Sequence, residues 1–321
     1  MSRKKRQRKH PTRLALQNRL ESLVLNAAMF LFRLIPVDAA SYLMGKSWRL
    51  FAPFNARHKR ALEHLERAFP SMSAREREQT VRGMWDNLGR VAAETFHIDR
   101  LLKQDHRFEA VGDEITNAVL EGEQACLLVS FHSGNWELCV QPAVRRGVDI
   151  TGVYQALRNP KADKAVRSLR QDLYRGGLLS KGPQTARKIL ATLKGGGVVA
   201  MMGDLREARG VQVPFFGQMA YANTVPASLA RSCHVPIVLG RVVRKKGVHF
   251  RVEGRAITVP HTQDRQADIQ SATAQMHEIF EGWIREHPEQ WMWIHKKWAP
   301  PGKSLIQRQQ HRAAAAKSFN G

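Results

Sequence analysis

The sequence predicts an α/β protein with a mixed, mainly parallel sheet flanked by helices, preceded by an N-terminal helical membrane-anchor region. From about residue 110 onward, short apolar runs alternate with segments of helical periodicity, as in sheets whose strands are joined by helices. Residues 37–110 have helical spacing alone. The first 36 residues combine a cluster of cations with an apolar helical segment, a pattern typical of membrane anchors.

The anchor region, residues 1–36, begins with a basic arm that holds seven Lys and Arg among its first thirteen residues. The uncharged run that follows, Ser22–Phe32, has eleven residues, whereas a membrane-spanning helix needs roughly twenty. No small-residue cleavage site follows, which argues against a signal peptide. We expect an anchor on the cytoplasmic face of an anionic membrane. The alternative is a basic tail followed by an ordinary core helix.

We expect one domain over residues 37–300, followed by a C-terminal tail over 301–321. Within it, residues 37–110 form a helical lead-in and residues 110–300 the α/β core. In the lead-in, one helix runs from Arg57 to Phe69 and stops at Pro70. The following segment, Ser71–Glu76, has the pattern of a helix cap and begins the next helix.

The core contains apolar runs that predict strands at 126–131, 150–154, 198–202, 236–243 and 248–252. The segments between the first four predict helices at about 135–145, 161–174, 184–194 and 225–233. The last two strands are joined by Arg244–Gly247, which is typical of a hairpin. A long helix, Asp264–Glu286, then ends before Pro288.

Composition limits the function. Lys and Arg number 51 against 28 Asp and Glu, a net charge of +23, which favours a nucleic acid, an anionic membrane, a phosphorylated substrate or an acidic protein as partner. No recognition-helix or aromatic RNA-binding signature is present, so nucleic acid is not expected. The three cysteines are scattered, and the thirteen histidines form no ligand pair at helical spacing, so we expect no metal and a reducing compartment.

The strand at 126–131 leads directly into the strongest candidate site. His132 follows the strand, Gly134 and Asn135 supply a turn and a helix cap, and Glu137 begins a helix. Open α/β sheets place their sites at the carboxyl ends of strands. A histidine oriented by a carboxylate is a general base near neutral pH, so His132 and Glu137 are the predicted catalytic pair. The alternative is a histidine that only caps a helix or bonds a carbonyl.

Other polar residues fall near the same predicted edge. Arg158 and Arg170 follow the strand at 150–154, Asp204 leaves the strand at 198–202, and Arg209 precedes an apolar loop at 211–217. One histidine, two acids and several arginines suit an anionic, partly apolar substrate. For Arg170 and Asp204 the alternative is an ordinary surface arginine and a helix-capping aspartate.

At these residues the chain resembles the bacterial lipid A late acyltransferase family, the lauroyl and myristoyl transferases of the lysophospholipid acyltransferase superfamily. The superfamily mark is a histidine followed after four residues by Asp or Glu, here His132 to Glu137. The likeness covers roughly residues 60–298. It includes the segments 68–70, 85–90, 152–154, 159–160, 203–204, 213–217 and 288–298.

The resemblance implies an acyl carrier protein (ACP)-dependent O-acyltransferase of the bacterial inner membrane, facing the cytoplasm, with no cofactor beyond the acyl-ACP donor. Its expected partners are ACP, anionic membrane lipids and a phosphorylated glycolipid acceptor, whose hydroxyl receives the acyl chain in lipopolysaccharide biosynthesis. His132 would be the base and Glu137 its orienter, with Arg170 and Asp204 at family positions for substrate binding or catalysis. The residues beside the Gly134 turn, or an arginine, are candidates to stabilise the oxyanion.

The chain departs from the family pattern at two places, where Gln155 and Leu205 replace the family's Arg and Gln. Both departures bear on the acceptor more than on the reaction. The alternative is therefore a related acyltransferase that acts on another glycolipid, an ornithine lipid or a phospholipid. A nucleic-acid-binding module that uses the net positive charge is the alternative from a different class.

Overall fold

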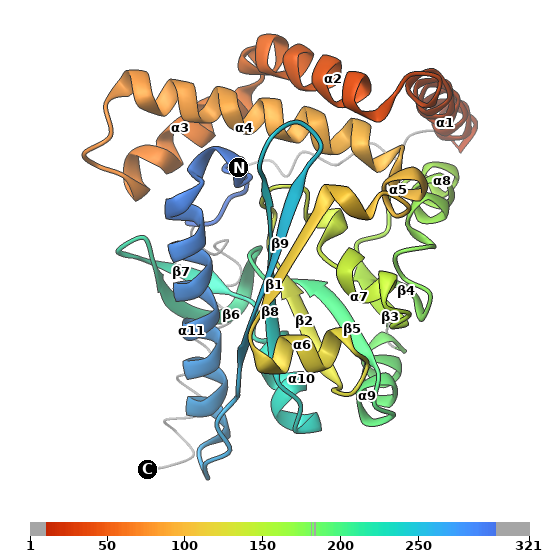
Figure 1. Ribbon diagram of the computed structural model, residues 1–321. Helices are drawn as coiled ribbons and strands as arrows, with labels where there is room; N and C mark the ends of the chain where they lie inside the picture. The colour runs from red at the N-terminus through yellow and green to blue at the C-terminus, as the bar shows by residue number, and fades with distance from the viewer. Residues whose placement is uncertain (1–10, 181, 183, 300–321) are drawn as a thin grey trace.

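The computed structural model describes residues 11–180, 182 and 184–299, and its centre is a seven-stranded sheet (Figure 1). The strand order is β1-β9-β8-β2-β5-β3-β4. The strands are β1 (Phe108–Gly112), β2 (Cys126–Ser130), β3 (Ile150–Tyr154), β4 (Gly177–Ser180), β5 (Val198–Met202), β8 (Ile237–Arg244) and β9 (Phe250–Ile257). Every neighbouring pair is parallel except β8 and β9, which form an antiparallel hairpin. The predicted mixed, mainly parallel sheet is therefore confirmed.

A separate two-stranded sheet pairs β6 (Arg206–Phe215) with β7 (Gln218–Ala222). The expectation of an apolar loop at 211–217 is wrong, because this segment is the end of β6 and its turn. The turn residues Phe216 and Gly217 both have positive φ, 52° and 70°. Hairpin turns of this kind usually carry Asn or Gly, so a phenylalanine gives little sequence signal for the turn.

Helices cover both faces of the sheet, and β2 shows how the two faces are divided. Leu127 and Val129 pack in one core with α9 (Thr185–Lys194), α10 (Val225–Cys233) and α11 (Arg265–Glu286). Cys126 and Leu128 point to the other core, with α6 (Glu114–Leu120) and α7 (Gln141–Arg145). Because alternate residues of a strand face opposite sides, an unbroken apolar run is what a strand buried on both faces requires.

The predicted helix at 135–145 is two short elements, the 3₁₀-helix η3 (Trp136–Leu138) and α7. Pro142 accounts for the break, since proline lacks the N–H that a continuous helix would bond to Leu138. Its ring also clashes with the preceding turn, so it is tolerated only near the start of a helix, where α7 holds it.

The α-helices that the structure describes ahead of the sheet are α1 (Pro11–Arg33), α2 (Val37–Phe51), α3 (Ala56–Ala68), α4 (Ala74–Thr95) and α5 (Ile98–Leu101). α4 begins with the predicted cap, in which the Ser73 side chain and Glu76 bond each other's backbone N–H groups. In Figure 1, α2, α3 and α4 lie along the top of the molecule. None of the helices within the described ranges is both long and apolar enough to cross a membrane.

α1 is docked on the body of the protein at two points. Near its start, the Asn159 amide donates to the Asn18 carbonyl over 2.8 Å, while the Asn159 oxygen caps α8 (Pro160–Arg170). At its end, Arg33 forms an ion pair with Asp99 at 2.7 Å. Residues 1–10, which hold six of the seven cations of the basic arm, and the tail over 301–321 lie outside the described residues.

Candidate active site

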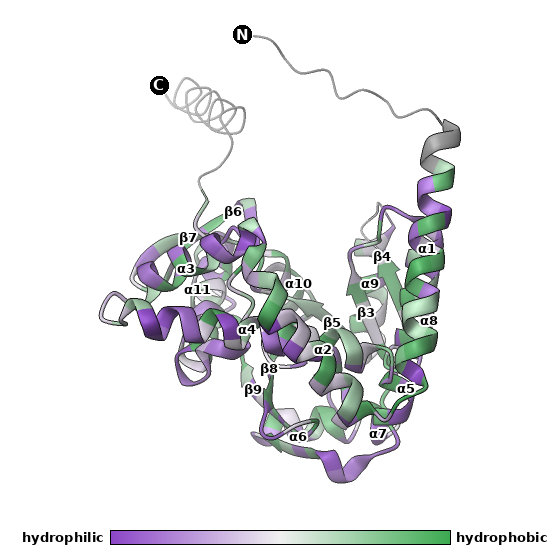
Figure 2. Ribbon diagram, turned by 90° about the horizontal axis from the view of Figure 1, so that it is seen from above, coloured by the Kyte–Doolittle hydropathy of each residue, from purple (hydrophilic) through white to green (hydrophobic). Residues whose placement is uncertain are grey.

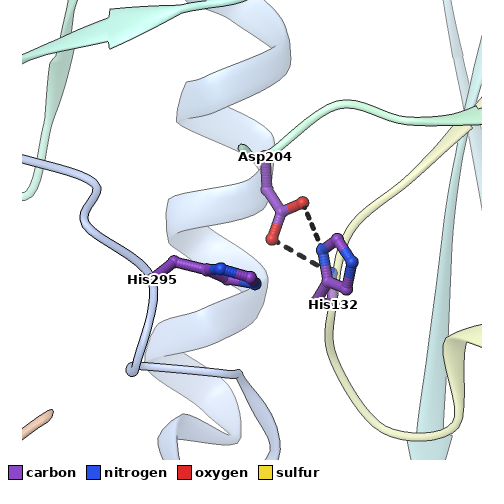
Figure 3. Close-up of side chains that lie close together, drawn as sticks. All are labelled: His132, Asp204 and His295. Atoms are coloured by element: carbon purple, nitrogen blue, oxygen red, sulfur yellow. Dashed lines mark hydrogen bonds and ion pairs between the residues drawn. The ribbon is translucent and has the colours of Figure 1, made fainter. Parts of the chain in front are cut away.

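His132 and Asp204 meet at the carboxyl edge of the sheet (Figure 3). They follow β2 and β5, which are parallel neighbours with Ser130 opposite Met202, so both chains leave the sheet at the same level. The imidazole Nδ1 of His132 lies 2.8 Å from Asp204 Oδ1, and the backbone N–H of His132 donates to Oδ2 over 3.0 Å. The aspartate side chain is 1% exposed and the histidine side chain 14%.

The Asp204 carboxylate determines which nitrogen of the His132 ring carries the proton. Burial alone would raise the pKa of the Asp204 carboxyl, but the adjacent His132 and its hydrogen bonds hold that pKa well below its usual range. The carboxylate is therefore ionised and accepts the proton on Nδ1. The lone pair is then on Nε2, which has no hydrogen-bond partner within the described part of the chain. This is the arrangement that a general base requires.

Glu137 does not orient His132, contrary to the sequence-based expectation. Its two oxygens accept hydrogen bonds from Arg170, with Nε–Oε2 at 2.8 Å and Nη2–Oε1 at 2.5 Å. Arg170 is the last residue of α8, and the pair is mostly buried. Burial would lower the pKa of Arg170, but the charge of Glu137 raises it above its ordinary value. Arg170 and Glu137 thus form one ion pair, while Asp204 takes the orienting position.

The turn after His132 explains why Glu137 faces elsewhere. Gly134 has a φ of 57°, and a Cβ at this position would lie 1.7 Å from the Val242 carbonyl oxygen. The chain thus reverses through a glycine packed against β8 instead of continuing into a helix. The N–H of Ser133 donates to Phe131 and that of Gly134 to Gln290, so these two groups are already used and do not point to an oxyanion.

The segment 288–298, near the C-terminus, packs against the His132–Asp204 pair. The sequence alone assigned it no role. The Trp291 indole N–H donates to Asp204 Oδ2 over 3.0 Å, and the Met292 N–H donates to the His132 carbonyl over 2.9 Å. Ser133 and Trp291 also form an antiparallel bridge. The only sequence signal was the cluster of Trp, His and Lys in this segment.

A buried ion pair supports the turn from the side of α4. Arg244, at the end of β8, bonds both oxygens of Glu94, with Nη1–Oε1 at 2.5 Å and Nη2–Oε2 at 2.9 Å. The amide of Asn135 donates to the same carboxylate over 2.7 Å, and the amide of Asn87 donates to the Gly134 carbonyl over 2.9 Å. Asn135 was expected to cap a helix, but its side chain is part of this network instead.

Two rings flank the His132 imidazole, that of Trp136 at 5.1 Å and that of His295 at 4.9 Å between centroids. The Nε2 atom of His295 is buried without a hydrogen-bond partner. Burial lowers the pKa of His295 to about 4, so this imidazole is neutral at physiological pH. In Figure 3, His295 approaches the pair from the side opposite to Nε2 of His132.

One nitrogen each of His132 and His295 and one oxygen of Asp204 lie within 4.8 Å of one another, a spacing that a metal ion can bridge. Both oxygens of Asp204, however, already accept N–H donors from His132 and Trp291. A metal would have to displace these bonds, so the donor set fits a hydrogen-bonded pair better than a metal site.

The remaining predicted substrate-binding residues lie on the surface. Arg158, in the loop between β3 and α8, is exposed, and so is Arg209 in β6. Neither forms an ion pair within the described ranges. Their proposed role thus stays a prediction, as cations available to a ligand rather than as parts of the His132–Asp204 pair.

We compared the chain with known proteins. The model of the bacterial lipid A biosynthesis acyltransferase family matches residues 6–299. The lipid A biosynthesis lauroyltransferase of Escherichia coli (strain K12) is 29% identical over 249 residues, which cover 73% of this chain and 76% of that protein. A crystal structure of the 1-acyl-sn-glycerophosphate (LPA) acyltransferase PlsC from Thermotoga maritima aligns with a TM-score of 0.34 and 12% identity, over 78% of this chain and 96% of that one.

Proposed function

Because this chain belongs to the bacterial lipid A biosynthesis acyltransferase family, we propose that it transfers a fatty acyl chain from ACP to a hydroxyl of a lipid A precursor of the Kdo-lipid A type. Family membership makes the protein an acyltransferase of lipid A biosynthesis. The acyl donor, the acyl acceptor and the catalytic base are our proposals. The single observation that carries it is the His132–Asp204 pair at the sheet edge, with Nε2 of His132 left unpaired.

The proposed reaction needs one base and no cofactor. His132 Nε2 removes the proton of the acceptor hydroxyl as its oxygen attacks the thioester carbonyl. The tetrahedral intermediate then collapses, the carbon–sulfur bond breaks, and the imidazolium returns the proton to the departing thiol of the carrier. Asp204 holds the ring in one orientation and stabilises the imidazolium formed during attack.

The charge of the chain supports both substrates. A net charge of +23 suits an acidic carrier protein as donor and the phosphate groups of the acceptor. Arg158 and Arg209 are exposed cations on segments that follow β3 and β5, and guanidinium groups bind phosphate bidentately. We assign these two arginines to acceptor or donor binding, and Arg170 to holding Glu137.

The proposed location is the cytoplasmic face of the bacterial inner membrane. Apolar side chains of α1 and α2 are exposed to solvent, and both helices show green stretches between more polar ones in Figure 2. The exposed set comprises Leu16, Leu20, Leu23, Val24, Phe30 and Leu31 of α1, Tyr42, Leu43, Leu50 and Phe51 of α2, and Phe54. Monomeric soluble proteins rarely expose an apolar patch of this extent, so we infer that a lipid surface covers it, with the basic arm on anionic headgroups.

An acceptor assay tests the function. Purified enzyme is given acyl-ACP with a Kdo-bearing lipid A precursor, an ornithine lipid or a lysophospholipid, and mass spectrometry follows the acylated products. We expect transfer to the lipid A precursor and none in the variant His132→Ala. Transfer to the ornithine lipid or the lysophospholipid alone would favour the related acyltransferase, and full activity of the variant would refute the base.

Vesicle flotation tests the location. The paired variants Leu43→Ser with Phe51→Ser remove apolar contacts of α2, and a chain lacking residues 1–36 removes the arm and α1. We expect both to bind vesicles of anionic phospholipid more weakly than the intact chain, with Glu63→Ser on α3 as a surface control. Unchanged flotation of both at high salt would contradict the membrane surface.

A further inference from the structure

Lys297 is a buried cation directly behind the catalytic pair. It is 1% exposed, and its Nζ donates to the backbone carbonyl of Asp204 over 2.7 Å. A second bond joins Nζ to Nε2 of His277 over 2.9 Å, and the ammonium lies 5.0 Å from the centroid of the Phe215 ring. All three contacts come from elements other than its own segment, namely the strand exit after β5, α11 and β6.

His277 can only accept from this lysine. Its Nδ1 donates to the Thr273 carbonyl over 2.9 Å, so the proton of the neutral ring is on Nδ1 and the lone pair on Nε2. Burial, reinforced by the charge of Lys297, lowers the pKa of His277 to about 3. The imidazole therefore stays neutral and supplies the ammonium with an acceptor but no counter-charge.

The counter-charge is the carboxylate of Asp204. Among the described residues, the ionisable groups that interact with Lys297 are Asp204, His277 and His295, and burial keeps both of these imidazoles neutral at physiological pH. Burying an ammonium costs free energy unless it is paired and hydrogen-bonded. A lysine at this position should therefore have a role that an apolar side chain could not fill. The negative charge of the Asp204 carboxylate and the positive charge of the Lys297 ammonium thus balance each other, with the backbone of residue 204 between them.

We propose that Lys297 is a positioning residue of the catalytic pair: it fixes the backbone of Asp204 and balances the charge of its buried carboxylate. This inference rests on the proposed role of His132 as base. A carboxylate beside an imidazole stabilises the imidazolium and so favours the protonated ring, which has no lone pair left to accept a proton. A balancing cation opposes that effect, so Asp204 can orient the ring while the lone pair on Nε2 stays available.

The ammonium of Lys297 also titrates within a pH range that an activity assay can cover. Burial lowers the pKa of its ammonium to about 8, and the charge of Asp204 opposes this shift. Below that pH the charged ammonium holds the Asp204 carbonyl and balances the carboxylate. Above it the amine is neutral, its hydrogen bond to that carbonyl is weaker, and the buried carboxylate is left unbalanced. The wild-type rate should therefore decline above about pH 8, whereas an arginine at this position remains charged.

The experiment compares full-length Lys297→Met, Lys297→Arg and the control Lys296→Met, whose native side chain is exposed on the neighbouring residue. The dependence of kcat/KM on pH is measured for acyl transfer, with melting temperatures in parallel. Lys297→Met should lower kcat/KM at pH 7 about tenfold or more and move the acid limb of the profile upward by about one pH unit. Lys297→Arg should restore most activity at pH 7 and lose the decline above pH 8. The control should match wild type.

The outcomes separate this inference from the proposed function. If His132→Ala keeps full activity, the proposed base is wrong whatever Lys297 does. If His132→Ala is inactive but Lys297→Met keeps the wild-type acid limb, Lys297 is only structural and the inference fails. If Lys297→Met does not fold, Lys297→Arg decides, because an unchanged alkaline limb in that variant would overturn the inference.

Discussion

Asp204 is held by four hydrogen bonds from three separate residues. Two N–H groups of His132 and the indole of Trp291 bond its carboxylate, and Lys297 bonds its carbonyl. A side chain held at this many points keeps one rotamer, so the imidazole that depends on it keeps one tautomer. The orientation of the proposed base, His132, is thus set by residues from distant parts of the chain.

We expect Asp204→Asn to reduce kcat by about 10³–10⁴-fold, because an amide in this place presents N–H to a ring nitrogen and selects the wrong tautomer. The fold should survive, since the amide has the same size and can still accept from Trp291. Steady-state acyl transfer measures the rate, and near-UV circular dichroism checks the packing. A loss below about tenfold would show that His132 does not need the carboxylate.

The Glu137–Arg170 pair leads to a stability prediction. Glu137→Leu or Arg170→Met alone should lower the free energy of unfolding by about 3 kcal/mol, since each leaves a mostly buried charge without its partner. The double variant should recover much of that loss, because the pair is removed together. Denaturant unfolding of all three variants gives the coupling, and additive single effects would refute it.

Sequence reasoning located His132 correctly at a strand end but chose the wrong acid to orient it. Glu137 is five residues away in the chain, whereas Asp204 is 72 away and meets His132 only because β2 and β5 are neighbours in the sheet. Nothing in a single sequence specifies that β5 lies between β2 and β3. The composition of the site was therefore predictable from the sequence, but its pairing was not.

At the scale of elements, Gly134 is a position that no other residue should fill. Gly134→Ala places a methyl group against the Val242 carbonyl and in the left-handed region, so it should cost well over the about 1–3 kcal/mol of backbone strain alone. Gly147→Ala is the matched control, since its φ is 86° and nothing lies within 4 Å of the added Cβ. Comparable destabilisation of both variants in urea would contradict the close packing of this turn.

The elements that the sequence predicted well are those whose signal is local. β3, β5 and α10 have the bounds expected from their apolar runs and helical spacing. The strands it did not predict, β1 and β4, lie at the two ends of the sheet, where partial exposure interrupts the apolar pattern. The β6–β7 hairpin was not predicted because its turn depends on tertiary packing of Phe216 rather than on turn residues.

At the scale of the whole molecule, buried neutral histidines predict sensitivity to acid. The folded-state pKa values of His277 and His295 are lowered to about 3 and 4, below the unfolded value near 6.5. Between these values the unfolded chain binds protons that the folded chain does not, so stability falls as the pH falls from about 6.5 toward 4. The loss is up to about 1.4 kcal/mol per pH unit for each histidine.

Urea unfolding at pH 7 and pH 5 measures this loss, and the variant His277→Gln should show a weaker dependence on pH than wild type. Its absolute stability at pH 7 is not the readout, because the buried glutamine has its own cost. If the two proteins lose the same free energy between these pH values, His277 is not a source of the acid sensitivity.

The bonds from Trp291 and Met292 to the His132–Asp204 pair also fix an order of events during synthesis. A ribosome completes β2 and β5, which lead to His132 and Asp204, well before it adds the segment 288–298, and chains fold from the N-terminus as they emerge. Until that segment is synthesised, Asp204 lacks the indole N–H donor of Trp291, and the carbonyl of His132 lacks the N–H donor of Met292. A chain released early, after residue 287, would lack both bonds, so we expect its proposed base to be poorly oriented.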